Sequence, residues 1–261
     1  MVFKKLMQAA GVGGPQVETI LHNPNTRPGE KLTGEVTIIG GKHDSDILGV
    51  NLALRTRVEI ESGDNEYASN LEYAKLPIAG RFELDDDARY SIPFEMQIPW
   101  EAPLTHFYGQ PLRGTTVGVA TELEVARAVD ATDLDPIAVH PLPAQELILS
   151  AFSSLGFRFK NADCEKGRIY GVKQQLPFYQ EIEFFPPPQY ASGIKQLELT
   201  FVSYPTSMDV VLELDKRGGA FTEGHDSFSR FTVDYASAAQ TNWEQQLDGF
   251  LQKAGKRKGF F

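Results

Sequence analysis

The sequence predicts an all-β protein: two tandem antiparallel β-sandwich domains with a short helix between them and an amphipathic helix at the C-terminus. Three observations lead to this prediction. Apolar and polar residues alternate with a period of two in most segments, as expected of strands with one buried face. Clusters of turn residues, such as 23–30 and 40–46, separate these runs. The chain of 261 residues is long enough for two domains of ordinary size.

The clearest strands of the first half are predicted at 49–61, 90–99 and 115–125. In 49–61, every second residue from Val50 to Ile60 is apolar or threonine, while most of the residues between them are polar or charged. Pro93 interrupts the second strand. Because proline has no N–H group for the ladder, this strand is expected at an edge or at a bulge.

Four more strands are predicted in the second half, at 180–185, 194–202, 208–215 and 230–235. Three consecutive prolines, Pro186 to Pro188, indicate a stiff loop between the first two. Between the two halves, Leu147, Ala151, Phe152 and Leu155 recur at helical intervals, which predicts a short helix.

The C-terminal segment differs in kind from the rest of the chain. Thr241 and Glu244 have the spacing of a capping box. One face of the following helix carries Trp243, Leu247, Phe250 and Leu251, and a basic tail ends the chain. The predicted organisation is an N-terminal segment 1–14, a β-sandwich 15–129, a linker 130–143, a second β-sandwich 144–236, and the helix with its tail 237–261.

Composition excludes several classes of function. The net charge of -10 argues against nucleic acid as a partner, because binding phosphates needs a basic surface. Cys164 is the only cysteine, so neither an intramolecular disulfide nor a thiolate zinc cluster can form. No signal peptide or apolar span is evident in the sequence. We therefore expect a cytoplasmic protein.

An acidic stretch in the middle of the chain is a candidate metal site. Asp130, Asp133 and Asp135 do not fit an EF-hand loop, because its sixth position is Asp135 instead of glycine and its twelfth is Pro141 instead of glutamate. The stretch is interpreted as a solvated linker. Three other acidic turns, at 44–46, 85–87 and 223–226, are more typical of hairpin tips, and whether they bind calcium stays open. We predict no metal site and no cofactor.

Known catalytic motifs are equally missing from the sequence, which contains no G-x-S-x-G, H-E-x-x-H or P-loop pattern. The histidines His22, His43, His106, His140 and His225 are far apart. Glu181 and Glu183 share one face of a strand, as a glycosidase pair could, but the alternating Ile182 and Phe184 favour a polar outer face over an apolar core. We predict no catalytic residue.

The order of segments resembles the bacterial sporulation-control (SpoOM) family. The likeness runs from Gln16 to Tyr235, nearly the whole chain. It rests on the segments 29–41, 117–160, 176–186, 197–202, 210–219 and 229–235. The resemblance implies two tandem arrestin-like β-sandwiches, no enzymatic activity, and a regulatory or scaffolding role through protein contacts.

The resulting hypothesis is a non-enzymatic, arrestin-like adaptor or scaffold whose protein partner the sequence does not identify. Its candidate partner-binding residues are Trp243, Leu247, Phe250 and Leu251, although docking of their helix on its own domain is the simpler interpretation. One alternative is a peripheral membrane protein that uses Phe3, Leu6, Met7 and Ala10 together with the basic tail. Another is a small-ligand-binding β-sandwich or an unrecognised hydrolase. An unpaired edge strand would allow a homodimer.

Overall fold

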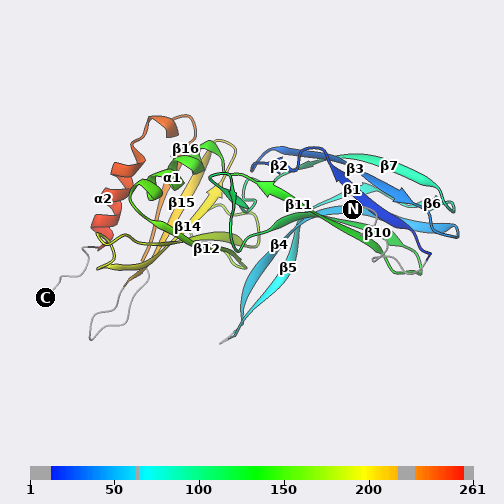
Figure 1. The fold of residues 1–261 in the computed structure, drawn as a ribbon, viewed down its shortest axis with the longest axis horizontal. Helices are drawn as coiled ribbons and strands as arrows, with labels where there is room; N and C mark the ends of the chain where they lie inside the picture. Colours follow the sequence, from blue (N-terminus) through cyan, green and yellow to red (C-terminus); the bar gives the residue numbers. More distant parts are fainter. Residues whose placement is uncertain (1–12, 63–64, 217–226, 256–261) are drawn as a thin grey trace. The chain divides into compact units, whose positions relative to one another are not determined.

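The chain folds mostly into strands, with two helices of more than three residues among the parts described. The computed structural model describes residues 13–62, 65–216 and 227–255 (Figure 1). The mainly β prediction is confirmed. Two compact units are present, and they are built from interleaved segments. Of the described residues, unit 1 contains those up to Arg57 with Ser69–Pro99 and Thr116–Val139, and unit 2 contains those of Val58–Ala68, Trp100–Thr115 and the part from His140 onward.

Unit 1 is built from strands in two sheets. One sheet has the order β1-β3-β7. In the other, β4 pairs with β10, β10 with β11, and β11 with β2, while β5 and β6 also pair with β4. The strands are β1 (Gln16–Leu21), β2 (Asn25–Thr26), β3 (Lys31–Ile39), β4 (Ser45–Ser62), β5 (Asn65–Ala79), β6 (Phe82–Leu84), β7 (Arg89–Gln97), β10 (Val117–Val125) and β11 (Ala131–Val139).

The core of unit 1 follows from the alternation in its strands. Leu32 and Ile38 on β3 are fully buried, as are Leu54 on β4 and Val119 on β10. The strands expected at 49–61, 90–99 and 115–125 are confirmed as β4, β7 and β10. Pro93 lies on β7, which ends its sheet within the described part of the chain and pairs with β3 alone, so the edge position is confirmed too.

The linker expected at 130–143 is mostly strand. Residues 131–139 form β11, which pairs antiparallel with β10. The carboxylate of Asp133 accepts a hydrogen bond of 2.9 Å from the Thr19 backbone N–H, and that of Asp130 accepts one of 2.9 Å from the Val125 N–H. The acidic stretch is therefore not a solvated linker, because two of its carboxylates satisfy backbone donors.

Unit 2 centres on a sheet with the order β16-β15-β14-β13-β12. A single pair, Glu165 with Glu59, joins β12 to the part of β4 that belongs to this unit. Its elements are β8 (His106–Phe107), β9 (Gln110–Pro111), α1 (Pro143–Ser154), β12 (Arg158–Glu165), β13 (Tyr179–Phe185), β14 (Ile194–Ser203), β15 (Ser207–Lys216), β16 (Ser227–Asp234), η1 (Ala238–Gln240) and α2 (Trp243–Gly255).

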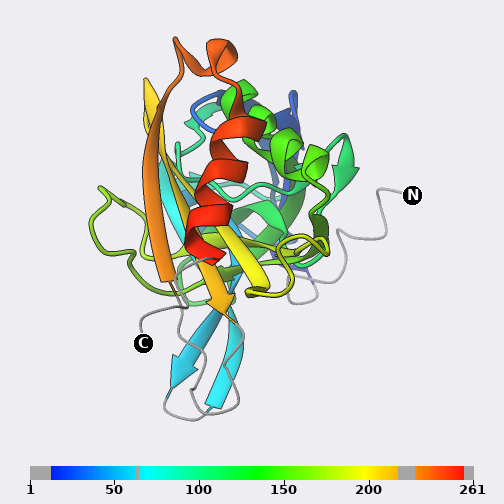
Figure 2. The same cartoon turned by 90° about the vertical axis from the view of Figure 1, so that its left-hand side faces the viewer.

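One face of this sheet is apolar and is covered by helices α1 and α2 (Figure 2). Ile182 and Phe184 on β13 and Leu212 on β15 are buried there. Phe152 from α1 stacks on Phe184 at 5.7 Å between ring centroids. The four strands expected in this half and the short helix are confirmed. The arrestin-like character of the two units stays an expectation from the resemblance.

The C-terminal helix α2 packs on its own unit. Trp243, Leu247 and Leu251 are buried, and Phe250 is half-buried. The Trp243 indole Nε1 donates to the carbonyl of Ala238 at 2.8 Å, and its ring stacks on Phe231. The Tyr190 hydroxyl donates to the Asp248 carboxylate. A role of the four apolar residues in binding a partner stays a prediction.

The expected capping box of α2 is wrong. The helix begins at Trp243, and the side chain of Asn242 accepts a hydrogen bond of 3.0 Å from the Gln245 N–H. The hydroxyl of Thr241 instead donates to the carbonyl of Ser237. Asparagine caps helices as well as threonine does, so the pattern of Thr241 and Glu244 was displaced by one residue.

The membrane-binding alternative rests largely on residues that lie outside those described. Phe3, Leu6, Met7 and Ala10 are among them, as is the basic tail from Lys256. Among the described residues, no helix has both the length and the apolar character that crossing a membrane requires.

Candidate functional site

The second face of the unit 2 sheet carries a cluster of carboxylates. Because side chains alternate along a strand, the residues between the core positions point to this opposite face. The strand register places Asp163 opposite Glu181, and Glu198 opposite both Glu183 and Glu213. The members of this cluster are Asp163 and Glu165 on β12, Glu181 and Glu183 on β13, Glu198 on β14 and Glu213 on β15.

Glu181 lies at the centre of the cluster. One carboxylate oxygen each from Glu181, Glu198 and Glu213 lies within 4.8 Å of the others, and the same is true of Asp163, Glu165 and Glu181. Glu181 is therefore common to two groups of three oxygens. Carboxylates this close repel one another when all are ionised.

This crowding changes the protonation of two carboxyl groups. Burial, and then repulsion from Glu198, raises the pKa of Glu181 to about 9. Burial, followed by a hydrogen bond and repulsion from Glu183, raises the pKa of Asp163 to about 7. At neutral pH, the folded protein thus keeps a proton on Glu181 that a carboxyl group in water would lose.

An ion pair neutralises one edge of the cluster. Lys160 pairs with Glu183 and also donates to the side-chain oxygen of Gln196 at 2.6 Å. The Gln196 amide in turn donates to Glu198 at 2.6 Å.

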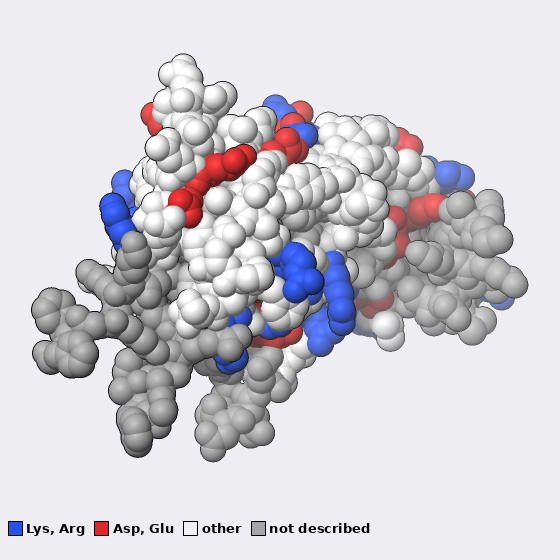
Figure 3. All heavy atoms as spheres, turned by 60° about the vertical axis from the view of Figure 1, so that its left-hand side comes forward, with Lys and Arg blue, Asp and Glu red and all other residues white. Residues whose placement is uncertain are grey.

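On the face of the molecule drawn in Figure 3, acidic and basic side chains occur in small groups between uncharged surface.

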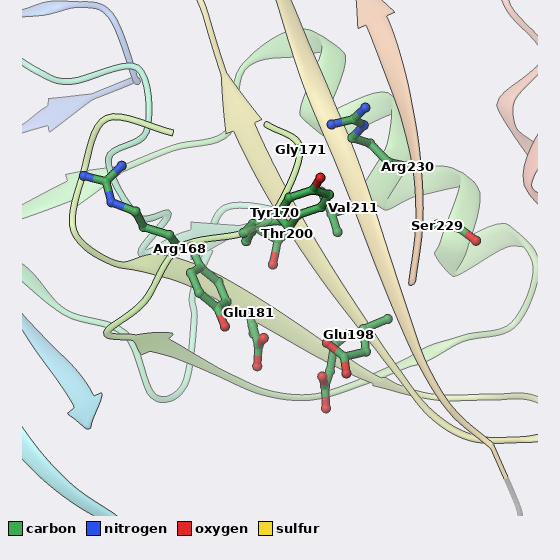
Figure 4. Close-up of a pocket in the computed structure, with 12 residues that line it drawn as sticks. Arg168, Tyr170, Gly171, Glu181, Glu198, Thr200, Val211, Ser229 and Arg230 are labelled. Atoms are coloured by element: carbon green, nitrogen blue, oxygen red, sulfur yellow. The ribbon is translucent and has the colours of Figure 1, made fainter. Parts of the chain in front are cut away.

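A cavity of about 600 Å³ opens over the carboxylates Glu181, Glu198 and Glu213. Its other walls are mainly apolar or aromatic, with two arginines. They are formed by Ile169, Tyr170, Gly171, Tyr179, Thr200, Val211, Ser229, Arg168 and Arg230. Figure 4 shows the carboxylates of Glu181 and Glu198 on the same side of the cavity, with the guanidinium groups of Arg168 and Arg230 away from them. The site thus combines an acidic floor with apolar walls.

One wall is the loop between β12 and β13, and a buried amide fixes its shape. Gln174 is 8% exposed, and its side-chain nitrogen donates to the carbonyls of Gly167, Leu176 and Phe178 at 2.8 to 3.1 Å. Its side-chain oxygen accepts from the Ile169 N–H at 2.8 Å. A single side chain therefore satisfies four backbone groups of this loop.

Further contacts hold the same loop from outside. The Glu101 carboxylate accepts hydrogen bonds of 2.8 to 2.9 Å from the backbone N–H groups of Gln175 and Leu176. The Lys173 N–H donates to the Tyr204 hydroxyl at 3.0 Å. Tyr170 at the cavity remains fully exposed. A wall that is fixed before binding loses little entropy when a ligand arrives.

The residues considered as candidates from the sequence lie at different positions in the structure. Glu181 and Glu183 lie on the polar face, as expected, but the sequence did not reveal that carboxylates from β12, β14 and β15 join them. Cys164 is buried, and its neighbours along β12 point to the carboxylate face. The rings of His106 and His140 lie 4.8 Å apart. Among the described residues that line the cavity, none is a histidine or a cysteine.

Comparison with known proteins places the chain in a family. The family model described as SpoOM protein matches residues 3–218. The chain belongs to the SpoOM family. It is 33% identical over 216 residues to the sporulation-control protein spo0M of Bacillus subtilis (strain 168), covering 82% of this chain and 81% of that protein.

A solved structure supports the same assignment for the SpoOM fold. The chain is similar to the crystal structure of Spo0M, sporulation control protein, from Bacillus subtilis, with a TM-score of 0.80 and 28% identity. The match covers 93% of this chain and 100% of that one. The resemblance seen in the sequence is thus confirmed.

Proposed function

We propose that this SpoOM-family protein is a regulatory adaptor that binds other proteins and catalyses no reaction. The observation that carries the proposal is the cavity of unit 2, with its carboxylate floor and its fixed loop. A concave, largely apolar site with a few convergent polar groups is typical of recognition. The relative is named a sporulation-control protein, which supports a regulatory role.

The spacing of the carboxylates favours binding over hydrolysis. A two-carboxylate glycosidase holds its groups about 5 Å apart or more on either side of the bond that breaks. Here, three oxygens from Glu181, Glu198 and Glu213 lie within 4.8 Å of one another on one floor. Glu181 keeps its proton at neutral pH, and the negative charges of Glu198 and Glu213 beside it concentrate negative potential at one point, which serves to attract a positive group.

The expected site of action is the cytoplasm. Cys164, the only cysteine of the chain, is buried and has no second cysteine with which to form a disulfide within the chain. A protein with a single cysteine suits a reducing compartment. The acidic chain, with its net charge of -10, also favours a protein partner over nucleic acid.

Site-directed cross-linking in the native cell tests the adaptor role. A photoreactive phenylalanine analogue replaces Tyr170, which is fully exposed at the cavity, or Tyr90, which is 42% exposed in unit 1. We expect irradiation to give discrete protein adducts from position 170 and not from position 90. If position 170 gives no protein adduct under conditions in which the protein is abundant, the adaptor role of this cavity is wrong.

A further inference from the structure

We propose that the cavity of unit 2 binds the side-chain cation of a lysine or arginine presented by an extended basic segment of a partner protein. The inference rests on the proposed adaptor function and names the chemistry of its partner. It depends on the cavity, on the arrangement of oxygens at its floor, and on the character of its walls.

The floor has the geometry of a receptor for one nitrogen. Three oxygens that lie within 4.8 Å of one another can all stand about 2.8 Å from a nitrogen placed between them, which is the length of a charge-assisted hydrogen bond. A lysine ammonium has three donors, and an arginine guanidinium has five. Glu198 and Glu213 can therefore bind one such group as carboxylates, while the protonated Glu181 accepts a third hydrogen bond through its carbonyl oxygen.

The walls suit the hydrocarbon part of the same side chain. Ile169 and the buried Val211 line the cavity beside Tyr179, and lysine and arginine bury their methylene stems against apolar surface of this kind. Tyr170, which is fully exposed, offers an aromatic face to a second cation or to the backbone of the segment.

The size of the cavity favours an organic cation over a bare metal ion. Its volume of about 600 Å³ equals the space that roughly twenty waters take in the liquid. Calcium needs six to eight oxygens close around it, whereas most of these walls carry carbon. A hydrocarbon chain ending in a cation uses both the floor and the walls.

The two arginines of the lining constrain the sequence of the segment. Arg168 and Arg230 lie away from the carboxylates (Figure 4), so a basic residue directly beside the bound one would approach a like charge. The Arg168 guanidinium donates a hydrogen bond of 3.0 Å to the backbone carbonyl of Gln174. We therefore expect lysines separated by small uncharged residues to bind better than a continuous basic run.

Binding of a defined peptide to the full chain tests the inference. The probe is a fluorescein-labelled peptide of three Gly-Ser-Lys repeats. The control is the same peptide with acetylated lysines, because acetylation keeps the length of the side chain and removes its charge. Fluorescence anisotropy at low salt gives the dissociation constant. We expect binding of the charged peptide and at least about tenfold weaker binding of the acetylated one.

Matched double variants locate the binding site. Glu198→Gln with Glu213→Gln removes two charges from the floor, while Glu95→Gln with Glu122→Gln removes two from exposed positions of unit 1. We expect the first pair to weaken peptide binding at least about tenfold and the second less than about twofold. Thermal unfolding of both proteins checks that each remains folded, as we expect, because the floor variant relieves repulsion and a glutamine at position 198 can still accept the hydrogen bond from Gln196. Tyr170→Ala should weaken binding severalfold.

Three results would overturn the inference. Equal weakening by both double variants would mean that the peptide follows the overall negative charge and not this cavity. Calcium binding at 1 mM that the floor variant abolishes, without any binding of the charged peptide, would identify a metal site instead. Protein adducts from position 170 in the cell, with no peptide binding, would overturn the cation inference and leave the adaptor function standing.

Discussion

The half-buried, protonated Glu181 predicts an unusual dependence of stability on pH, which Glu181→Gln should remove. Its pKa is about 9 in the folded protein, against 4.5 ordinarily. Below pH 4.5, the carboxyl group is protonated in both the folded and the unfolded state, and its contribution to the free energy of unfolding is fully present. As pH rises from 4.5 to 9, the unfolded chain ionises and the folded one does not, so the free energy of unfolding falls.

The size of this loss follows from the shift. Each pH unit in that window costs about 1.4 kcal/mol, so about 4 kcal/mol is lost by pH 7.5. Glutamine has nearly the same shape, cannot ionise, and can donate to the neighbouring Glu198. We therefore expect Glu181→Gln to be stabilised relative to the natural protein, by an amount that grows steadily with pH.

Urea unfolding at pH 5, 6, 7 and 8 measures the effect. The two tryptophans of the chain, Trp100 and Trp243, both belong to unit 2, so their fluorescence reports on the unit that contains Glu181. Glu122→Gln, an exposed change in unit 1, is the control and should follow the natural protein. A stability difference between Glu181→Gln and the natural protein that stays constant from pH 5 to 8 would refute the reasoning.

Three other predictions concern the helix and the loop. Trp243→Ala should lower the free energy of unfolding by about 3 to 5 kcal/mol in urea titration, because it removes a buried ring from the contact of α2 with its unit, whereas the exposed Glu244→Ala should have little effect. Gln174→Ala should cost about 1 to 3 kcal/mol by leaving backbone groups of the β12–β13 loop unpaired; faster hydrogen exchange over residues 167–178 would show this, with the exposed Gln175→Ala as control. Gly171 has a φ of 82°, so Gly171→Ala should lower the thermal midpoint by the equivalent of about 1 to 2 kcal/mol, and an unchanged midpoint would show that the loop relaxes without strain.

Strands β4, β7, β10 and β13 to β16 and the two helices were predictable because each depends on residues that are close in sequence. The alternation of β4 and the helical spacing before Gly156 were sufficient for the elements themselves. The strand β11 was missed because its acidic side chains and Pro136 look like a loop. Only the distant backbone donor of Thr19 shows why Asp133 belongs in a strand.

The carboxylate cluster could not be derived from one strand at a time. In its own strand, each of Glu181, Glu198 and Glu213 has the position of an outward-facing polar residue of an ordinary half-buried strand. Their convergence depends on the register of β13, β14 and β15, which the separate sequence segments do not define. Acidic residues at outward positions of three successive strands were the one signal that could have pointed to the site.

The interleaving of the two units bears on the order in which the chain can fold during synthesis. Unit 2 uses residues 58–68 and 100–115, which leave the ribosome before unit 1 is complete. Strand β12 and the residue that follows it bond to both early segments: the Ala162 N–H donates to the carbonyl of Arg113, and the Lys166 N–H donates to the carbonyl of Glu59. All segments of unit 1 are available once residue 139 has left the ribosome. The two early segments of unit 2, however, cannot form their bonds until β12 has been synthesised. Contacts between segments that are far apart in the sequence slow folding. A fragment that begins at residue 144 would lack both early segments of unit 2.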